Sequence, residues 1–258
     1  MRFLLKILLT ALFASSILTA NQDNLIKIGS SIVPHADILR FIKPKLKEKG
    51  YELKIFEFND GVIPNVMVEE GELDANYFQH LPYLKEFNES RGTHIVSVGS
   101  IHIEPMGIYS SKHKKFDPKD QATISIPNNP TNEARALRII ASAGLITLKD
   151  SELVTPRDIL DNPRNLRFIE LKDAHQTRAL SDVDFAVINS NMSILGGLNP
   201  VKDSLYTESK FSEYGNIIAV KEGNENLPKI KALLEVLKSP EVKAFIEEKF
   251  KGALIPTF

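Results

Sequence analysis

The order of hydrophobic and polar residues predicts alternating strands and helices in the first third of the chain. Residues 25–32 form a mostly apolar run of strand length. Residues 34–49 carry apolar side chains at helical spacing, and Gly50 follows as a stop signal. Residues 51–58 alternate as a strand does, and residues 62–70 again suit a helix. This order predicts an α/β protein with a mainly parallel sheet and helices on both faces.

A new alternation begins at residue 122 and indicates a second lobe. Residues 122–126 suit a strand, and residues 131–143 suit a helix that stops at Gly144. The later segments repeat the pattern, with strands expected at 166–171, 184–189 and 216–220 and helices at 227–238 and 240–250.

The chain is expected to cross between the two lobes twice. We expect residues 21–109 and 214–258 to form lobe 1 and residues 110–213 to form lobe 2. Two such crossings make a hinge, and a cleft between lobes is a preferred place for a small ligand.

The beginning of the chain, residues 1–20, has the layout of a secretory signal peptide. Arg2 and Lys6 supply a basic start, residues 7–18 are mainly apolar, and Ala20 is the expected last residue removed. The apolar stretch is short for a membrane span, which needs about 20 apolar residues. We expect this segment to direct export to the periplasm and then to be cleaved. The alternative is an uncleaved anchor.

Composition excludes several kinds of site. The formal net charge of −1 gives no electrostatic case for nucleic-acid binding. The sequence has no cysteine, which excludes disulfides, a thiol nucleophile, a thiolate metal site and a lipid-modified cysteine. We therefore expect a freely soluble periplasmic protein that is not lipid-anchored.

The segment DANYFQH, residues 74–80, gathers aromatic, histidine and amide side chains at the end of a short strand expected at residues 74–77. A further helical segment is expected to begin at Leu84. In parallel α/β sheets, ligands sit outside the carboxyl ends of the strands. Tyr77, Phe78 and His80 therefore suit recognition of a small ligand with an apolar part. The alternative is that the two aromatic rings only pack in the core.

The segment NNPTNEAR, residues 128–135, joins an expected strand to an expected helix. Asn129 suits the N-cap and Pro130 the first helical position, so free N–H groups there attract a carboxylate. Arg135 follows one turn later and can add a bidentate grip. The alternative is an ordinary cap with a solvated arginine.

Two further asparagines, Asn189 and Asn216, lie at the ends of expected strands. An amide accepts from an ammonium group and donates to a carboxylate, although asparagine is also common in turns.

Nothing in the sequence specifies a catalytic or metal site. The six histidines include no HExxH or HxxxH pair, and His102 with Glu104 on one strand face is a weak metal signal. Neither GxSxG nor a P-loop is present, and no Ser/His/Asp triad can be assigned from the position of Ser31. We expect no catalytic residue, metal or cofactor.

At these residues the chain resembles the NlpA/MetQ family of substrate-binding proteins of methionine ABC importers. The matching segments run in the same order from about residue 26 to the C-terminus: DANYFQH, PMGIYS, NNPTNEARAL, ASAGLITLKD, AVIN and NIIAV. The resemblance implies a type II periplasmic-binding-protein fold, in which two α/β lobes with a two-segment hinge close on a methionine-like ligand.

The resemblance also implies a role for each matching residue. The aromatic and histidine side chains would surround the thioether, Arg135 would hold the carboxylate, and the amides would orient the amino and carboxylate groups. The implied ligand-binding set is Tyr77, Phe78, His80, Asn128, Asn132, Arg135, Asn189 and Asn216. Ser190-Asn191-Met192 departs from relatives that carry an aromatic residue there, which leaves the pocket size open.

The resulting hypothesis is a monomeric, non-enzymatic receptor. It would bind L- or D-methionine or a methionine-containing dipeptide in the interlobe cleft and deliver it to an ABC permease of the inner membrane. The alternatives are a hydrolase on the same two-lobed scaffold and a metal-uptake binding protein.

Overall fold

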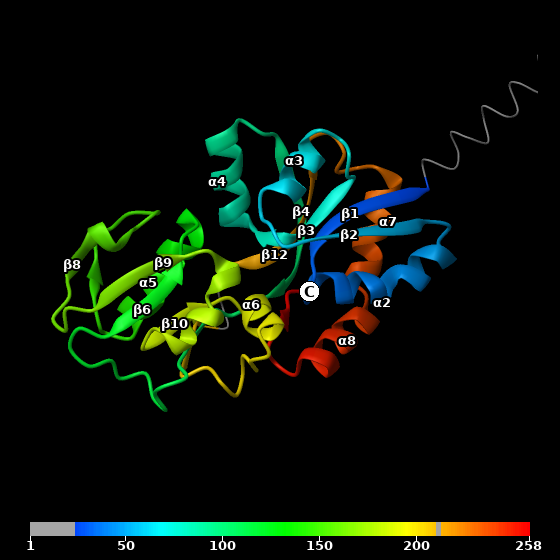
Figure 1. Ribbon diagram of the computed structural model, residues 1–258. Coiled ribbons are helices and arrows are strands. Elements are labelled where there is room, and N and C mark those ends of the chain that lie inside the picture. The colour runs from blue at the N-terminus through cyan, green and yellow to red at the C-terminus, as the bar shows by residue number, and fades with distance from the viewer. Residues whose placement is uncertain (1–23, 210–212) are drawn as a thin grey trace, which may run out of the picture. The chain divides into compact units, whose positions relative to one another are not determined.

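The computed structural model describes residues 24–209 and 213–258 (Figure 1). The expected signal peptide, residues 1–20, lies outside these residues. Within the described ranges, no helix has the length and apolar character needed to cross a membrane.

Two larger sheets carry most of the strands. The six-stranded sheet has the order β13-β4-β12-β3-β1-β2. Its strands are β1 Leu25–Ser31, β2 Glu52–Phe58, β3 Ala75–His80, β4 Ile95–Ile103, β12 Gly215–Lys221 and β13 Ile255–Pro256. Strand β1 pairs in parallel with both β2 and β3, whereas β13 runs antiparallel to β4.

The five-stranded sheet has the order β11-β5-β10-β6-β9. Its strands are β5 Gly107–Tyr109, β6 Thr123–Pro127, β9 Arg167–Leu171, β10 Phe185–Ile188 and β11 Tyr206–Thr207. Strand β6 pairs in parallel with β9 and β10, and β5 is antiparallel to β10 and β11. The remaining pair is β7 Thr147–Leu148 with β8 Ile159–Asp161.

Seven α-helices connect these strands in the described part of the chain. They are α2 His35–Glu48, α3 Ile63–Glu69, α4 Leu81–Arg91, α5 Pro130–Ser142, α6 Ser190–Leu195, α7 Pro228–Leu237 and α8 Pro240–Phe250. Short 3-10 turns occur at η1 Pro156–Asp158, η2 Asp173–His175 and η3 Arg178–Ser181. The predicted alternation of strands and helices is therefore confirmed.

The chain divides into two compact units. Of the described residues, unit 1 comprises 24–78, 94–99 and 218–242, and unit 2 comprises 79–93, 100–209, 213–217 and 243–258. The lobe boundaries expected from the sequence stay a prediction.

Unit 1 is built around the buried face of α2. Ile38, Leu39, Ile42 and Leu46 are fully buried at helical spacing, as the sequence pattern predicted. Helix α2 contacts β1, β2 and α7, and Figure 1 shows α2 and α7 beside these strands. Burying each such side chain contributes about 1.5–3 kcal/mol, so this face accounts for much of the stability of unit 1.

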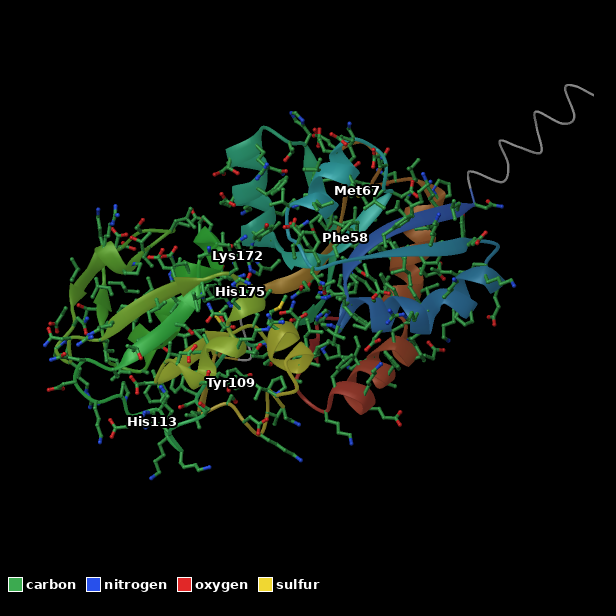
Figure 2. All side chains as sticks on the ribbon, viewed as in Figure 1. Phe58, Met67, Tyr109, His113, Lys172 and His175 are labelled. Carbon is green, nitrogen blue, oxygen red and sulfur yellow. The ribbon has the colours of Figure 1, made fainter. Side chains whose placement is uncertain are left out.

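Unit 2 has its core between α5 and the five-stranded sheet. Leu137 and Ile140 of α5 pack in one cluster with Ile124 of β6 and Phe185 of β10. On the edge of this core, the ring of His113 stacks on Phe185 at 4.9 Å, and the Tyr109 hydroxyl donates to Ser193 Oγ at 3.3 Å. Figure 2 labels Tyr109 and His113 in this part of the chain.

Two element boundaries differ from the sequence prediction. Strand β3 extends to His80, beyond the expected end at Tyr77, and α4 begins directly at Leu81. The reason is that His80 serves as both the last strand residue and the helix N-cap, its side chain accepting from Tyr83 N. Tyr77 and Phe78 are thus strand residues, and only His80 lies at the strand end.

The packing of unit 2 predicts contrasting costs for two isoleucines on neighbouring strands. Ile124 is fully buried, whereas Ile169 of β9 is 38% exposed. Ile124→Ala should lower the free energy of unfolding by about 2–5 kcal/mol because it leaves a cavity. Ile169→Ala should cost less than about 1 kcal/mol. Urea unfolding measures both, and equal losses would contradict the placement of the core.

Candidate functional site

The start of α5 places two predicted binding residues on one buried helix face. Asn129 is the N-cap, its Oδ1 accepting from Asn132 N at 3.0 Å, and Pro130 opens the helix, both as predicted. Asn132 and Arg135 are one turn apart and therefore share a face. Both are buried, with exposed fractions of 6% and 2%.

His80 fixes the orientation of Asn132. Its Nδ1 accepts from Tyr83 N at 3.1 Å, so in the neutral ring Nε2 carries the proton. Nε2 lies 3.0 Å from Asn132 Oδ1 and donates to it. The amide oxygen is thereby occupied, and the Nδ2 group of Asn132 faces away from His80 with two N–H donors.

Burial keeps His80 uncharged. Desolvation is the main cause that lowers its pKa from 6.5 to about 3, and the charge of Arg135 lowers it further. The hydrogen bond with Asn132 opposes these effects only in part. His80 therefore contributes an uncharged N–H donor, Nε2, to the site.

Arg135 is held on three sides. Its Nε and Nη2 donate to Glu208 Oε1 and Oε2 at 3.0 and 2.5 Å, a bidentate pair. Nη2 also donates to the carbonyl oxygen of Glu104 at 2.9 Å. The guanidinium lies over the ring of Tyr214 at 4.2 Å. Among the described residues these bonds use Nε and Nη2, which leaves Nη1 for a further acceptor.

Tyr214 contacts both His80 and Arg135. Its ring meets the His80 ring edge-on at 5.0 Å and lies under Arg135, and it is only 8% exposed. We name His80, Asn132, Arg135, Glu208 and Tyr214 the His80–Arg135 cluster. All five belong to unit 2.

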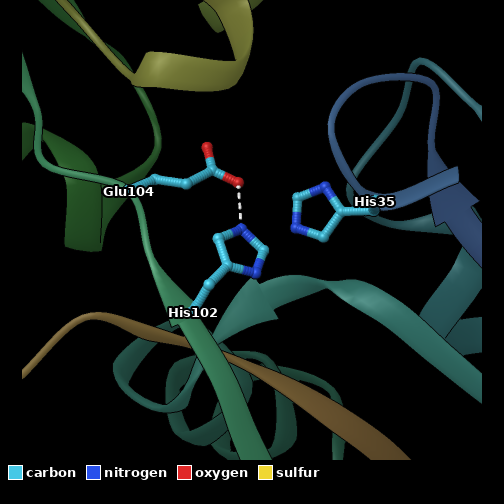
Figure 3. A group of neighbouring side chains, drawn as sticks. All are labelled: His35, His102 and Glu104. Carbon is cyan, nitrogen blue, oxygen red and sulfur yellow. Dashed lines mark hydrogen bonds and ion pairs between the residues drawn. The ribbon is translucent and has the colours of Figure 1, made fainter. Parts of the chain in front are cut away.

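Glu104 ties the cluster to the start of α6. Its carbonyl accepts from Arg135, and its Oε2 accepts from Asn191 N at 3.0 Å. Its Oε1 pairs with His102 Nε2 at 2.9 Å (Figure 3). His102 and Glu104, which gave the weak metal signal in the sequence, thus form a buried hydrogen-bonded pair.

Asn189 ends β10 immediately before α6. Its Oδ1 is buried and has no hydrogen-bond partner among the described residues. A buried acceptor without a donor is costly, so this oxygen suits a donor brought by a ligand.

Tyr77, Phe78, Asn128 and Asn216, the other predicted residues, are not members of the His80–Arg135 cluster. Tyr77, in unit 1, is fully buried, with its ring edge-on to His35 at 4.5 Å, and Phe78 is half-buried. Asn128 is exposed, and its N–H donates to Leu171 O at 3.0 Å. Asn216 is buried near the start of β12. The structure therefore brings His80, Asn132 and Arg135 together, and Glu104 links Arg135 to Asn191, two residues after Asn189.

Sequence reasoning missed Glu208, Tyr214 and the role of Glu104. Tyr214 lies two residues before Asn216, and an aromatic beside a predicted binding residue was a usable signal. Glu208 gives no such signal, because its partner Arg135 is 73 residues away.

Comparison with known proteins places the chain. Residues 26–258 match the family model described as NlpA lipoprotein. The methionine-binding lipoprotein MetQ of Bacillus subtilis is 43% identical over 90% of this chain and 87% of its own length.

Solved structures give the same picture. A nutrient-binding protein from Burkholderia cenocepacia, bound to methionine, has a TM-score of 0.88 and 41% identity, covering 90% of this chain and 100% of its own. A periplasmic substrate-binding protein of an ABC transporter from Coxiella burnetii has a TM-score of 0.87 and 40% identity over the same shares, 90% and 100%. The predicted α/β periplasmic-binding-protein fold is confirmed.

The prediction about location is wrong. We expected a freely soluble periplasmic protein that is not lipid-anchored, because the sequence has no cysteine. The matching family is described as a lipoprotein family, and the Bacillus subtilis relative is named a lipoprotein. The error was to let one missing residue type decide the location, since the absence of cysteine carries no conclusion on how the chain is held.

The family match covers the described chain almost from end to end, and the relatives agree with it in sequence and in fold. The resemblance inferred from six short segments is therefore confirmed. This chain belongs to the NlpA lipoprotein family, a family of substrate-binding proteins.

Proposed function

We propose that this chain binds methionine, as the L- or D-amino acid or within a short peptide, and delivers it to an ABC permease. The names of its relatives support the ligand and the transport system. The observation that carries the proposal is the set of buried donors on the first turns of α5, in the same unit as a buried acceptor at the end of β10.

The carboxylate would bind at α5. Within the described residues, the bonds of the protein leave Asn132 Nδ2 and Arg135 Nη1 as donors on the buried face of this helix. The helix N-terminus adds a favourable dipole for an anion. Because Glu208 and Tyr214 fix the guanidinium, little side-chain entropy is lost when the ligand arrives.

The ammonium group would bind at the amide oxygens. Asn189 Oδ1 is a buried acceptor without a partner in the described chain. Strand β10, which Asn189 ends, pairs directly with β6, which leads into α5. The two charged ends of a zwitterion therefore meet residues that follow adjacent strands. Asn128 and Asn216 would complete this half.

The thioether would contact aromatic side chains, for which we retain Tyr77, Phe78 and His80. A neutral His80 can lie against an apolar side chain without the cost of desolvating a charge. Sulfur makes favourable contacts with aromatic rings, which suits methionine over an aliphatic ligand of similar size.

The chain would act as a monomeric receptor without turnover, needing no cofactor. Membership in a substrate-binding family supports this over the hydrolase alternative. Ser31 Oγ does lie 2.5 Å from His35 Nδ1, but both residues belong to unit 1, outside the His80–Arg135 cluster.

Removing Arg135 should abolish tight methionine binding. Because Arg135→Ala alone leaves Glu208 as an unpaired buried charge, the test is Arg135→Ala combined with Glu208→Gln. We expect a loss of about 2–5 kcal/mol of binding free energy, measured by titration calorimetry.

Arg138→Ala is the matched control. Arg138 lies three residues further along α5 and donates to the Ser151 carbonyl at 2.9 Å, outside the cluster. Its affinity for methionine should equal that of the wild type. An unchanged affinity in the Arg135 double variant would contradict the carboxylate role, and no binding by the wild type would contradict the proposed function.

His80 should remain neutral where an ordinary histidine titrates. Its imidazole resonances should not shift between about pH 5 and pH 8 in the folded protein. Between a pKa of about 3 in the folded chain and the usual 6.5, only the unfolded chain binds this proton. Stability should therefore fall with falling pH in that window, by up to about 1.4 kcal/mol per pH unit.

An NMR titration measures this pKa directly, with His80→Gln identifying the resonance. A midpoint near 6.5, the ordinary value, would show that His80 is not buried beside Arg135 as described.

A further inference from the structure

A second buried acceptor oxygen lies at the end of β9. Asp173 begins the turn η2, and Figure 2 labels Lys172 and His175 on this segment. Asp173 Oδ2 accepts from Asn129 Nδ2 at 2.8 Å. Its Oδ1 is buried and has no hydrogen-bond partner in the part of the chain that the structure describes. Asn129 thus anchors Asp173 through Oδ2, and Oδ1 is left as an acceptor for a ligand.

The sheet places this oxygen at the same edge as Asn189. Strands β10, β6 and β9 are parallel neighbours, so their carboxyl ends meet at one edge. Asn128 N donates to Leu171 O at 3.0 Å, which holds the ends of β6 and β9 together. Asn129 then joins the two segments, since it caps α5 and holds Asp173.

Two partnerless acceptors therefore follow strands on either side of β6. A buried carboxylate oxygen without a donor is unfavourable, and burial raises the pKa of Asp173 to about 6 even though Asn129 lowers it. A ligand cation would relieve this cost, whereas an anion would increase it. The part of the site that suits a cation thus has a second acceptor, Asp173 Oδ1, besides Asn189 Oδ1.

We propose that Asp173 is an ammonium-binding residue, whose Oδ1 accepts a charge-assisted hydrogen bond from the α-amino group alongside Asn189 Oδ1. This inference rests on the proposed methionine function and deepens it. Arg135 and Asp173 would then receive the opposite charges of the zwitterion. The pair would select α-amino acids over carboxylic acids that lack the amino group.

The test is a cycle of two ligands and two proteins. The ligands are L-methionine and its deaminated analogue, in which hydrogen replaces the α-amino group, and the proteins are the wild type and Asp173→Asn. Titration calorimetry should show that Asp173→Asn weakens L-methionine binding by about 10- to 100-fold. Binding of the deaminated analogue should change by less than about twofold, because it has no ammonium group to lose.

Controls separate the possible outcomes. Asp161→Asn, at an exposed position of β8 in the same unit, should bind both ligands as the wild type does. Asp173→Ser removes the carboxylate with a smaller side chain, so it covers the case in which Asp173→Asn fails to fold. Thermal unfolding of each variant reports on folding directly.

Equal weakening of both ligands, or of neither, would overturn the role of Asp173. That result would leave the methionine function intact if the wild type binds L-methionine. A wild type that binds neither ligand would overturn the proposed function itself.

Discussion

The buried charge of Arg135 is the constraint on which the site depends. A guanidinium with 2% exposure is unfavourable unless its donors find acceptors. Glu208 supplies a bidentate carboxylate, Glu104 a carbonyl, and Tyr214 an aromatic face. These partners come from two segments, so satisfying one charge brings the end of β4 and the segment between β11 and β12 against helix α5.

The same constraint contributes to the state of His80. Burial is the main cause that lowers the pKa of its ring, and the nearby positive charge of Arg135 lowers it further. A neutral ring must then divide its nitrogens into one acceptor and one donor, which Tyr83 N and Asn132 Oδ1 satisfy. The orientation of Asn132 follows from that division. Burial of His80 and the charge of Arg135 thus act together on which groups remain to meet a ligand.

Local patterns predicted the elements that depend on local physics. The periodicity of α2 and the Asn129-Pro130 start of α5 follow from rules that act within one turn, and both were predicted correctly. Short elements such as β13 Ile255–Pro256 and β7 Thr147–Leu148 are strands only because another strand pairs with them, and the sequence gives no sign of them. The double use of His80 in strand and helix was missed for another reason: its bond to Tyr83 N is local, but histidine is not among the residues usually expected at an N-cap.

The same contrast between local patterns and long-range contacts applies to the residues of the site. His80, Asn132 and Arg135 stand in dense polar segments and were found, but their interactions were not. His80 meets Asn132 across 52 positions and Arg135 meets Glu208 across 73, distances over which pattern reasoning has no information. Asp173 was not singled out because a single acid after a strand is ordinary in sequence, and it is set apart only by Oδ1, which has no partner among the described residues. The error about lipid anchoring came from treating an absent residue as evidence.

Native mass spectrometry tests the central claim most directly, since it asks the folded protein which ligand it holds. The purified protein would be incubated with an equimolar mixture of amino acids and transferred to buffer without ligand. The bound molecule would then be released and identified by fragmentation. The proposed site predicts one retained ligand per chain, and that ligand is methionine. Retention of a different amino acid, or of none, would contradict it.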